Sequence, residues 1–125
     1  MNQSSLDTLA KVRKDGAEGN TVVMLYGDSI TDGYGSTDYI TNKYGWGHLL
    51  QEAFQSIDPS FTIDQQGCGT RCVSEHCARH CSNDTLCQQA LTHNVSAVVL
   101  FLGSNDAKSF QWNETTFKRD YVKLC

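Results

Sequence analysis

The stretch Val22-Val23-Met24-Leu25-Tyr26-Gly27-Asp28-Ser29-Ile30-Thr31 decides how this chain folds. It begins with five apolar residues, a run typical of a strand that is buried on both faces within a helix-covered parallel sheet. The run stops at Gly27, and polar residues follow at once. Open α/β sheets bind ligands outside the carboxyl ends of their strands, so Ser29 lies where a nucleophile is useful.

Two similar stretches follow along the chain. Gly67-Cys68-Gly69 comes after a short strand predicted over 61–63, and Gly103-Ser104-Asn105-Asp106 directly follows an apolar strand predicted over 97–102. Helical patterns separate these strands. Strands that alternate with helices predict a right-handed, parallel βαβ architecture.

The helices are predicted from their apolar spacing and their caps. Asp58-Pro59 ends one predicted over 46–57, Asn83 or Asp84 caps another, and Asn113 caps a last one that starts at Glu114. The first of these should pack on the sheet through Trp46, Leu49, Leu50, Ala53, Phe54 and Ile57. We expect residues 1–20 to form an N-terminal helix and a linker.

The three polar blocks together resemble a known family. Gly27-Asp28-Ser29-Ile30-Thr31 resembles the first signature block of the SGNH/GDSL esterases and lipases, Gly67-Cys68-Gly69 resembles their glycine block, and Gly103-Ser104-Asn105-Asp106 resembles their G-x-N-D block. The resemblance implies a flavodoxin-like, three-layer α/β/α fold with strand order 2-1-3-4-5. Only the first three strands are found, so we expect 21–125 to be part of an SGNH domain.

The resemblance also implies a site and a reaction, the hydrolysis of acyl esters without a cofactor or a metal. Ser29 would be the nucleophile, and its backbone N–H would form an oxyanion hole with the Gly69 N–H and the Asn105 side-chain amide. The glycine block is one residue shorter than the family's G-x-S-G, so Gly67 stays open as the alternative donor. Asp28 and Asp106 should hold the loops through hydrogen bonds rather than transfer protons.

The family's last block, an Asp-x-x-His, is absent from this sequence. None of His48, His76, His80 and His93 has an aspartate three residues before it. His76 and His80 are substitute bases in principle, although surface positions are the more ordinary interpretation. A truncated enzyme and a non-catalytic remnant that binds an ester or a glycan therefore both stay open.

The chain has six cysteines, and five of them are clustered between Cys68 and Cys87. Interleaved with His76 and His80, they allow a metal-binding module as a further alternative, but no C-x-x-C pair typical of zinc sites occurs. Disulfides fit this density better. We expect at least two of the clustered thiols to pair and Cys125 to stay unpaired.

Composition bounds the remaining possibilities. The 125 residues suit at most one domain, and ten basic against fourteen acidic residues give a net charge of −4 with no basic stripe for nucleic acid. No apolar run is long enough to span a bilayer. The first 20 residues contain no apolar signal segment, whereas the cysteines and four Asn-x-Ser/Thr sequons favour a relative from the secretory pathway.

The expected partner is a small-molecule ester, such as a lipid, an acetylated sugar or a simple ester. Tyr34, Tyr39 and Trp112 are candidates to line an apolar pocket, or are ordinary core or surface aromatics. In the implied strand order, the strand over 97–102 has a neighbour on one side only. Such an open apolar edge predicts self-association of the chain.

Overall fold

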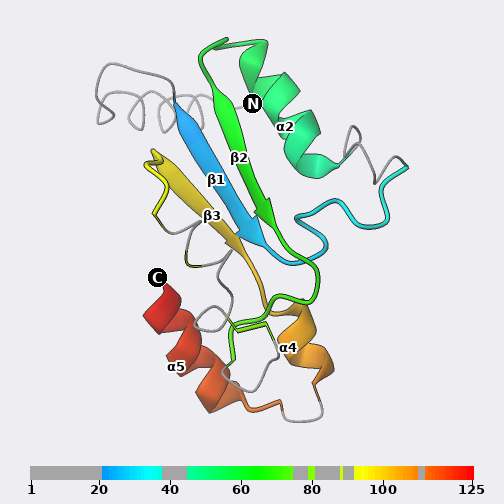
Figure 1. Cartoon of the computed structure of the whole chain (residues 1–125), viewed down its shortest axis with the longest axis vertical. Coiled ribbons are helices and arrows are strands. Elements are labelled where there is room, and N and C mark those ends of the chain that lie inside the picture. Colours follow the sequence, from blue (N-terminus) through cyan, green and yellow to red (C-terminus); the bar gives the residue numbers. More distant parts are fainter. Residues whose placement is uncertain (1–20, 38–44, 75–78, 81–87, 89–91, 110–111) are drawn as a thin grey trace.

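The structure is a computed structural model that describes residues 21–37, 45–74, 79–80, 88, 92–109 and 112–125 (Figure 1). Its elements in chain order are β1 (Val22–Gly27), α2 (Trp46–Gln55), β2 (Thr62–Gly67), β3 (Ala97–Phe101), α4 (Ser104–Lys108) and α5 (Glu114–Leu124). The N-terminal helix expected within 1–20 and the helix expected from Asn83 or Asp84 lie outside the described residues.

The strands form one parallel sheet of order β2-β1-β3, with β1 in the centre (Figure 1). Gly27 at the end of β1 lies opposite Gly67 of β2 on one side and Phe101 of β3 on the other. This confirms the predicted α/β class with a flavodoxin-like arrangement of the first three strands. All three strands therefore end at the same edge of the sheet.

The centre of the core is β1, as its apolar run predicts. Leu25 faces α2, since a Cβ on Gly47 of that helix would lie 3.0 Å from Leu25 Cδ1. Successive strand residues point to opposite faces, so Met24 and Tyr26 point away from α2; they are 1% and 0% exposed. The apolar residues packed against these two are Val95, Leu100, Leu102 and Leu124.

The predicted second strand is too short. Instead of ending at Ile63, β2 continues to Gly67 through polar residues, because its in-register pairing with β1 satisfies the backbone and its side chains find partners. Gln65 Nε2 donates to the Thr31 carbonyl at 2.7 Å, and Gln66 Nε2 donates to Asp64 Oδ1 at 2.6 Å. A periodicity of apolar residues cannot reveal such a strand.

The predicted end of helix α2 is also wrong. The helix ends at Gln55, and the Ile57 N–H donates to the Phe54 carbonyl in a tighter i→i−3 bond. Leu49 and Ile57, predicted to pack on the sheet, are 49% and 57% exposed. The apolar side of α2 is consequently narrower than its sequence indicates.

Strand β3 is less buried than predicted, but it lies at the edge of the sheet as expected. Burial on both faces was predicted, yet Val98, Val99 and Phe101 are 47%, 42% and 49% exposed. Among the described residues β3 pairs with β1 alone, so it forms an edge of the sheet, as the strand order implied.

Two helices follow β3, beyond the strand ends (Figure 1). The short α4 was not predicted; it begins after Gly103, whose φ of +120° is a conformation that favours glycine. Helix α5 has the predicted cap, since Asn113 Oδ1 accepts a bond from the Thr116 N–H at 2.9 Å. In the part of the chain that the structure describes, no helix has the length and apolar character needed to cross a bilayer.

Candidate active site

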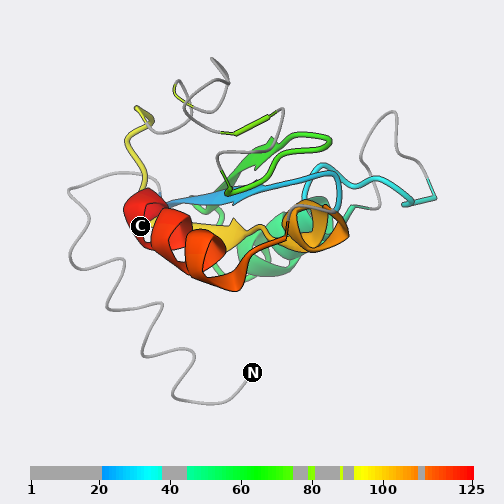
Figure 2. The same cartoon turned by 90° about the horizontal axis from the view of Figure 1, so that it is seen from below.

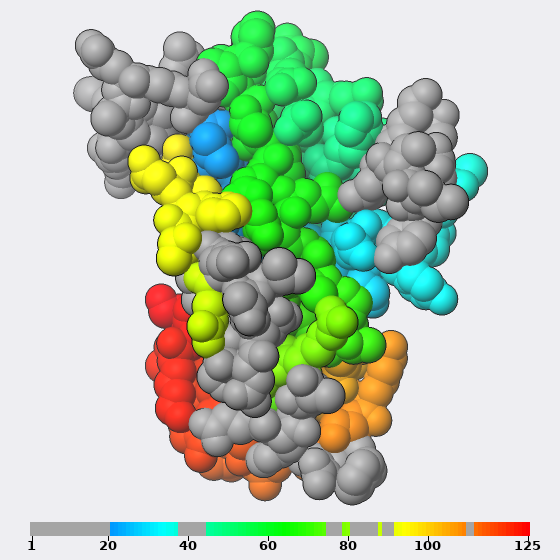
Figure 3. Space-filling view, in the orientation of Figure 1, coloured from blue at the N-terminus to red at the C-terminus, as the bar shows by residue number. Residues whose placement is uncertain are grey.

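The three polar blocks meet at the carboxyl edge of the sheet. Ser29 follows Gly27 by two residues, Gly69 follows Gly67 by two, and Asn105 follows Phe101 by four. Because Gly27 pairs with both Gly67 and Phe101, the second and third segments leave strands that each lie about 4.8 Å from β1, on its two sides. Seen from this edge, the end of β1 lies between the segment after β2 and α4 (Figure 2). On one face of the molecule, the segments after β1 and β2 adjoin α4 (Figure 3).

The segment after β1 is a compact turn around Ser29. Asp28 Oδ1 accepts from the Ile30 N–H at 2.9 Å, and the Ser29 carbonyl accepts from the Tyr34 N–H at 2.8 Å. Ser29 itself is half-buried. Within the described residues no hydrogen bond engages its hydroxyl, so the turn fixes the Ser29 backbone and leaves Oγ for other contacts.

The two candidate glycines of the second block have different surroundings. A Cβ on Gly67 would lie 2.1 Å from the Asp32 nitrogen and 2.4 Å from Asp32 Cα, which is a backbone clash. A Cβ on Gly69 would meet no atom within 4 Å. Gly67 is therefore required where β2 packs on the segment after β1, whereas Gly69 faces open space.

A tight turn follows Gly69. Thr70 has a φ of +64°, the one non-glycine residue with positive φ among those described, and the Arg71 N–H donates to the Cys68 carbonyl at 3.2 Å. A residue other than glycine stays in this sparsely populated conformation only where its surroundings hold it there. The turn is therefore fixed by neighbouring contacts rather than by the preference of its own residues.

The third block connects to both of the others. Ser104 Oγ donates to Asp28 Oδ2 in a short bond, and Asn105 Nδ2 donates to the Arg71 carbonyl at 2.9 Å. Asp28 thereby joins the first block to the third, and Asn105 joins the third to the turn after the second. These contacts hold the three segments in one arrangement.

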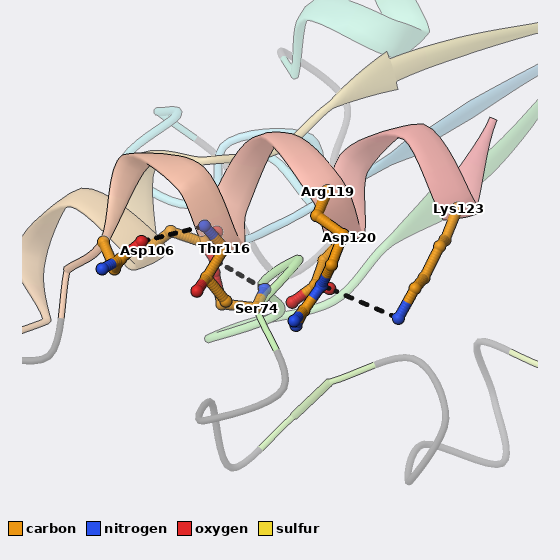
Figure 4. A network of polar contacts seen from close by, with 7 residues as sticks. Ser74, Asp106, Thr116, Arg119, Asp120 and Lys123 are labelled. Carbon is orange, nitrogen blue, oxygen red and sulfur yellow. Dashed lines mark hydrogen bonds and ion pairs between the residues drawn. The ribbon is translucent and has the colours of Figure 1, made fainter.

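Asp106 supports the segment after that turn. It is 2% exposed, and its carboxylate accepts from the Val73 N–H at 3.1 Å. It also accepts from the Ser74 N–H at 2.8 Å (Figure 4). A buried carboxylate is costly unless it is hydrogen-bonded, and these backbone donors satisfy it. Asp106 therefore fixes residues 73–74 against α4.

A second buried carboxylate, Asp120, was not anticipated from the sequence. Its side chain is 1% exposed and lies 2.8 Å from Arg119 Nε and 3.7 Å from Lys123 Nζ, so two cations of α5 pair with it (Figure 4). These ion pairs offset part of the cost of burying its charge.

None of the described histidines forms a hydrogen bond with Ser29. His48 Nε2 lies 3.2 Å from Glu52 Oε1 on α2, and His80 lies beside Cys72 in an isolated β-bridge. His76 lies outside the described residues. Of the two substitute bases that the sequence offers, His80 makes no hydrogen bond to Ser29 among the described residues, and the prediction for His76 stays a prediction.

A carboxylate–imidazole pair does occur elsewhere on the sheet. Asp64 Oδ2 lies 2.6 Å from His93 Nδ1, a pair that sequence reasoning missed because 29 residues separate its members. Asp64 lies opposite Met24, three residues, or about 10 Å, before the end of β1 at Gly27. The pair thus belongs to the middle of the sheet rather than to the strand ends.

The cysteine predictions are only partly within the described structure. Buried Cys72 is disulfide-bonded, and its partner is not among the described residues. Cys68 and Cys125 are free thiols, and Cys68 Sγ lies 2.8 Å from Arg79 Nη1. No three potential metal ligands gather within the described residues, but most of the cysteine cluster lies outside them. Which cysteines of the cluster pair with one another stays a prediction, and so does the metal-binding alternative.

The fold and the site together define a class of protein. A parallel sheet with flavodoxin-like strand order carries glycine-rich and small polar loops at the carboxyl ends of three strands, the arrangement of SGNH-type hydrolases. The sequence profile of the GDSL-like lipase/acylhydrolase family matches residues 25–125. The chain belongs to this family.

The chain is also similar to a solved structure, the crystal structure of a carbohydrate acetylesterase family member from Sinorhizobium meliloti. The two share 24% sequence identity with a TM-score of 0.62, over 83% of this chain and 51% of that one. The chain spans about half the length of that protein, and the likeness shows a common fold. No curated protein matches the sequence.

Proposed function

We propose that this chain acts in the hydrolysis of a small-molecule acyl ester, with Ser29 as the nucleophile. The observation that carries the proposal is the meeting of the three blocks at one edge of the sheet, where Gly27 pairs with Gly67 and with Phe101. Family membership supports the reaction class. The Ser29 hydroxyl makes no hydrogen bond within the described residues, so it is available to attack.

In the proposed reaction, Ser29 Oγ adds to the ester carbonyl carbon and loses its proton to a base. The carbonyl oxygen becomes an oxyanion, which then collapses and expels the alcohol with a proton. Water next adds to the acyl group on Ser29 and releases the acid, which restores the serine. An ester hydrolase of this kind needs hydrogen-bond donors aimed at the oxyanion.

Three donors suit the oxyanion. The Ser29 N–H belongs to a fixed turn, and the Gly69 N–H belongs to a segment with open space in front of it, in contrast to the crowded Gly67. Asn105 Nδ2 carries two hydrogens, one of which bonds the Arg71 carbonyl and orients the amide. The second hydrogen is then the candidate donor to the substrate.

A second candidate function is ester or glycan binding without turnover. The specific observation in its favour is that no described histidine forms a hydrogen bond with Ser29, while a serine hydroxyl without a base is a weak nucleophile. Oxyanion donors alone still give some rate enhancement over water. The substrates to test first are acetylated sugars, because the similar structure is a carbohydrate acetylesterase family member, beside p-nitrophenyl acetate.

The test compares the parent chain with Ser29→Ala and Asn105→Ala in p-nitrophenyl acetate turnover and in labelling by a fluorophosphonate probe. Ser29→Ala should lose labelling completely, because the probe reacts with the nucleophile. Asn105→Ala should lower turnover about a hundredfold, the usual cost of one oxyanion donor.

The matched control is Ser56→Ala, which removes an exposed hydroxyl next to the end of α2 and should change neither readout. Labelling that persists in Ser29→Ala would refute the assignment of the nucleophile. Binding of an acetylated sugar without turnover or labelling in the parent would establish the second candidate.

A further inference from the structure

Arg71 is a buried charged residue close to the proposed site, and the sequence pattern did not single it out. It is 1% exposed, and among the described residues it is the largest one that is almost fully buried. We infer that Arg71 is a positioning residue, which fixes the Gly69 and Asn105 donors of the oxyanion hole. The inference rests on the proposed function.

The side chain joins the ends of two strands. Arg71 Nη1 donates to the Gly27 carbonyl at 3.1 Å and, in a short bond, to the Gln66 carbonyl. The Gly27 carbonyl also accepts from the Cys68 N–H at 3.1 Å. One guanidinium nitrogen therefore holds together the last carbonyl of β1, where the first block begins, and the penultimate carbonyl of β2, immediately before the second block.

An aromatic ring sets the orientation of the guanidinium. Arg71 Cζ lies 4.4 Å from the centroid of the Tyr26 ring, and Tyr26 is 0% exposed within the core. A guanidinium over an aromatic face is attracted to it, the more so where water is excluded. The buried ring of β1 and the two carbonyls thus define both the plane and the position of the Arg71 side chain.

The main chain of Arg71 reaches the third block. Its N–H closes the turn from Cys68 at 3.2 Å, which includes Gly69 and the strained Thr70, and its carbonyl accepts from Asn105 Nδ2 at 2.9 Å. Anchoring the Arg71 side chain consequently anchors the turn that carries the Gly69 N–H. It also anchors the acceptor that orients the Asn105 amide.

These contacts predict a specific kinetic effect. Arg71 is buried, its N–H closes the turn that contains Gly69, and its carbonyl binds Asn105, so its effect on the ester passes through Gly69 and Asn105. Displaced oxyanion donors weaken binding of the transition state more than binding of the ground state. Loss of the side chain should therefore lower kcat and leave KM nearly unchanged.

The kinetic experiment compares Arg71→Met, Arg71→Lys and the exposed control Lys118→Met with the parent chain. Arg71→Met should lower kcat about a hundredfold, the cost of misplaced catalytic groups, with KM within about threefold. Lysine keeps the charge and can donate to both carbonyls, so Arg71→Lys should recover about a tenth of the parent kcat. Lys118→Met should match the parent.

A second measurement does not depend on turnover. In nitrogen-15 NMR spectra of the free protein, the Asn105 side-chain amide of Arg71→Met should shift and exchange with solvent at least tenfold faster, and Arg71→Lys should restore part of its protection. If the parent neither turns over ester nor reacts with the probe, the proposed function fails. These spectra then decide alone whether Arg71 positions Asn105.

The two variants keep the inference testable if one does not fold. A folded Arg71→Met or Arg71→Lys with the parent's kcat and an unchanged Asn105 amide would overturn it. So would a rise in KM at unchanged kcat, because that result would assign Arg71 to substrate binding instead. A lower kcat at constant KM together with the altered amide supports it, in whichever variant folds.

Discussion

Gly67 and Gly69 stand two residues apart, yet their surroundings give them different tasks. Only a hydrogen fits at Gly67, where a Cβ would lie 2.1 Å from the backbone of Asp32, while open space surrounds Gly69. Gly69 also has no positive φ that would exclude a side chain. The two glycines therefore form a matched pair, one needed for packing and the other free to serve as a donor.

Alanine substitution separates these tasks. Gly67→Ala forces β2 away from the segment after β1, and we expect it to lower the free energy of unfolding by about 3 kcal/mol or more, since the clash is with backbone. Gly69→Ala should change it by no more than about 0.5 kcal/mol. Urea denaturation followed by circular dichroism measures both, and equal losses would show that the local packing differs from that described.

At the scale of elements, α4 holds the loop that follows β2. Asp106 of this short helix accepts two backbone N–H groups of the buried residues Val73 and Ser74. Both bonds end on Oδ1, and the Val73 N–H also lies 3.1 Å from Oδ2. The loop geometry thus depends mainly on one oxygen atom.

This geometry predicts that asparagine can replace Asp106 far better than alanine can. Asp106→Ala leaves two buried N–H groups without a partner and should destabilise the chain by about 2 kcal/mol or more, because each such group costs about 1–3 kcal/mol. Asp106→Asn keeps the Oδ1 acceptor and should cost about half as much.

Urea unfolding gives the stabilities, and hydrogen exchange at the Val73 and Ser74 amides gives the local effect. Lys108→Ala, an exposed change on the same helix, is the control and should leave both quantities unchanged. Full amide protection in a folded Asp106→Ala would contradict the role given to this carboxylate.

At the scale of the whole molecule, β3 leaves an apolar edge open. Val98, Val99 and Phe101 are 42–49% exposed, and β3 pairs with β1 alone among the described residues. An exposed apolar edge is a template for a strand from another copy. We expect this chain to self-associate at micromolar concentration.

A charge on the edge should oppose that association. Val99→Lys places an ammonium group on the strand and should shift the chain toward monomer, whereas Val122→Lys, on the 75% exposed Val122 of α5, should not. Size-exclusion chromatography with light scattering measures the mass of each. A parent chain that stays monomeric at this concentration would refute the prediction.

The sequence by itself determined the architecture and the location of the candidate site. The apolar run of β1 and the glycine-containing blocks at Ser29, Gly69 and Asn105 are local patterns, each readable within about ten residues. The order of strands and helices then restricts the topology, because parallel strands joined by helices end at one edge of the sheet. This is why the three blocks were expected together.

Only the tertiary structure decided how those blocks are held. The second half of β2 is polar, so its sequence lacks the alternation of apolar residues that predicts a strand. It is a strand because it pairs with β1. The contacts of Arg71 with Gly27 and Asn105, and the pair of Asp64 with His93, join residues 29 to 44 positions apart. Such contacts form only after the chain has folded, because they depend on which strands become neighbours rather than on any local pattern.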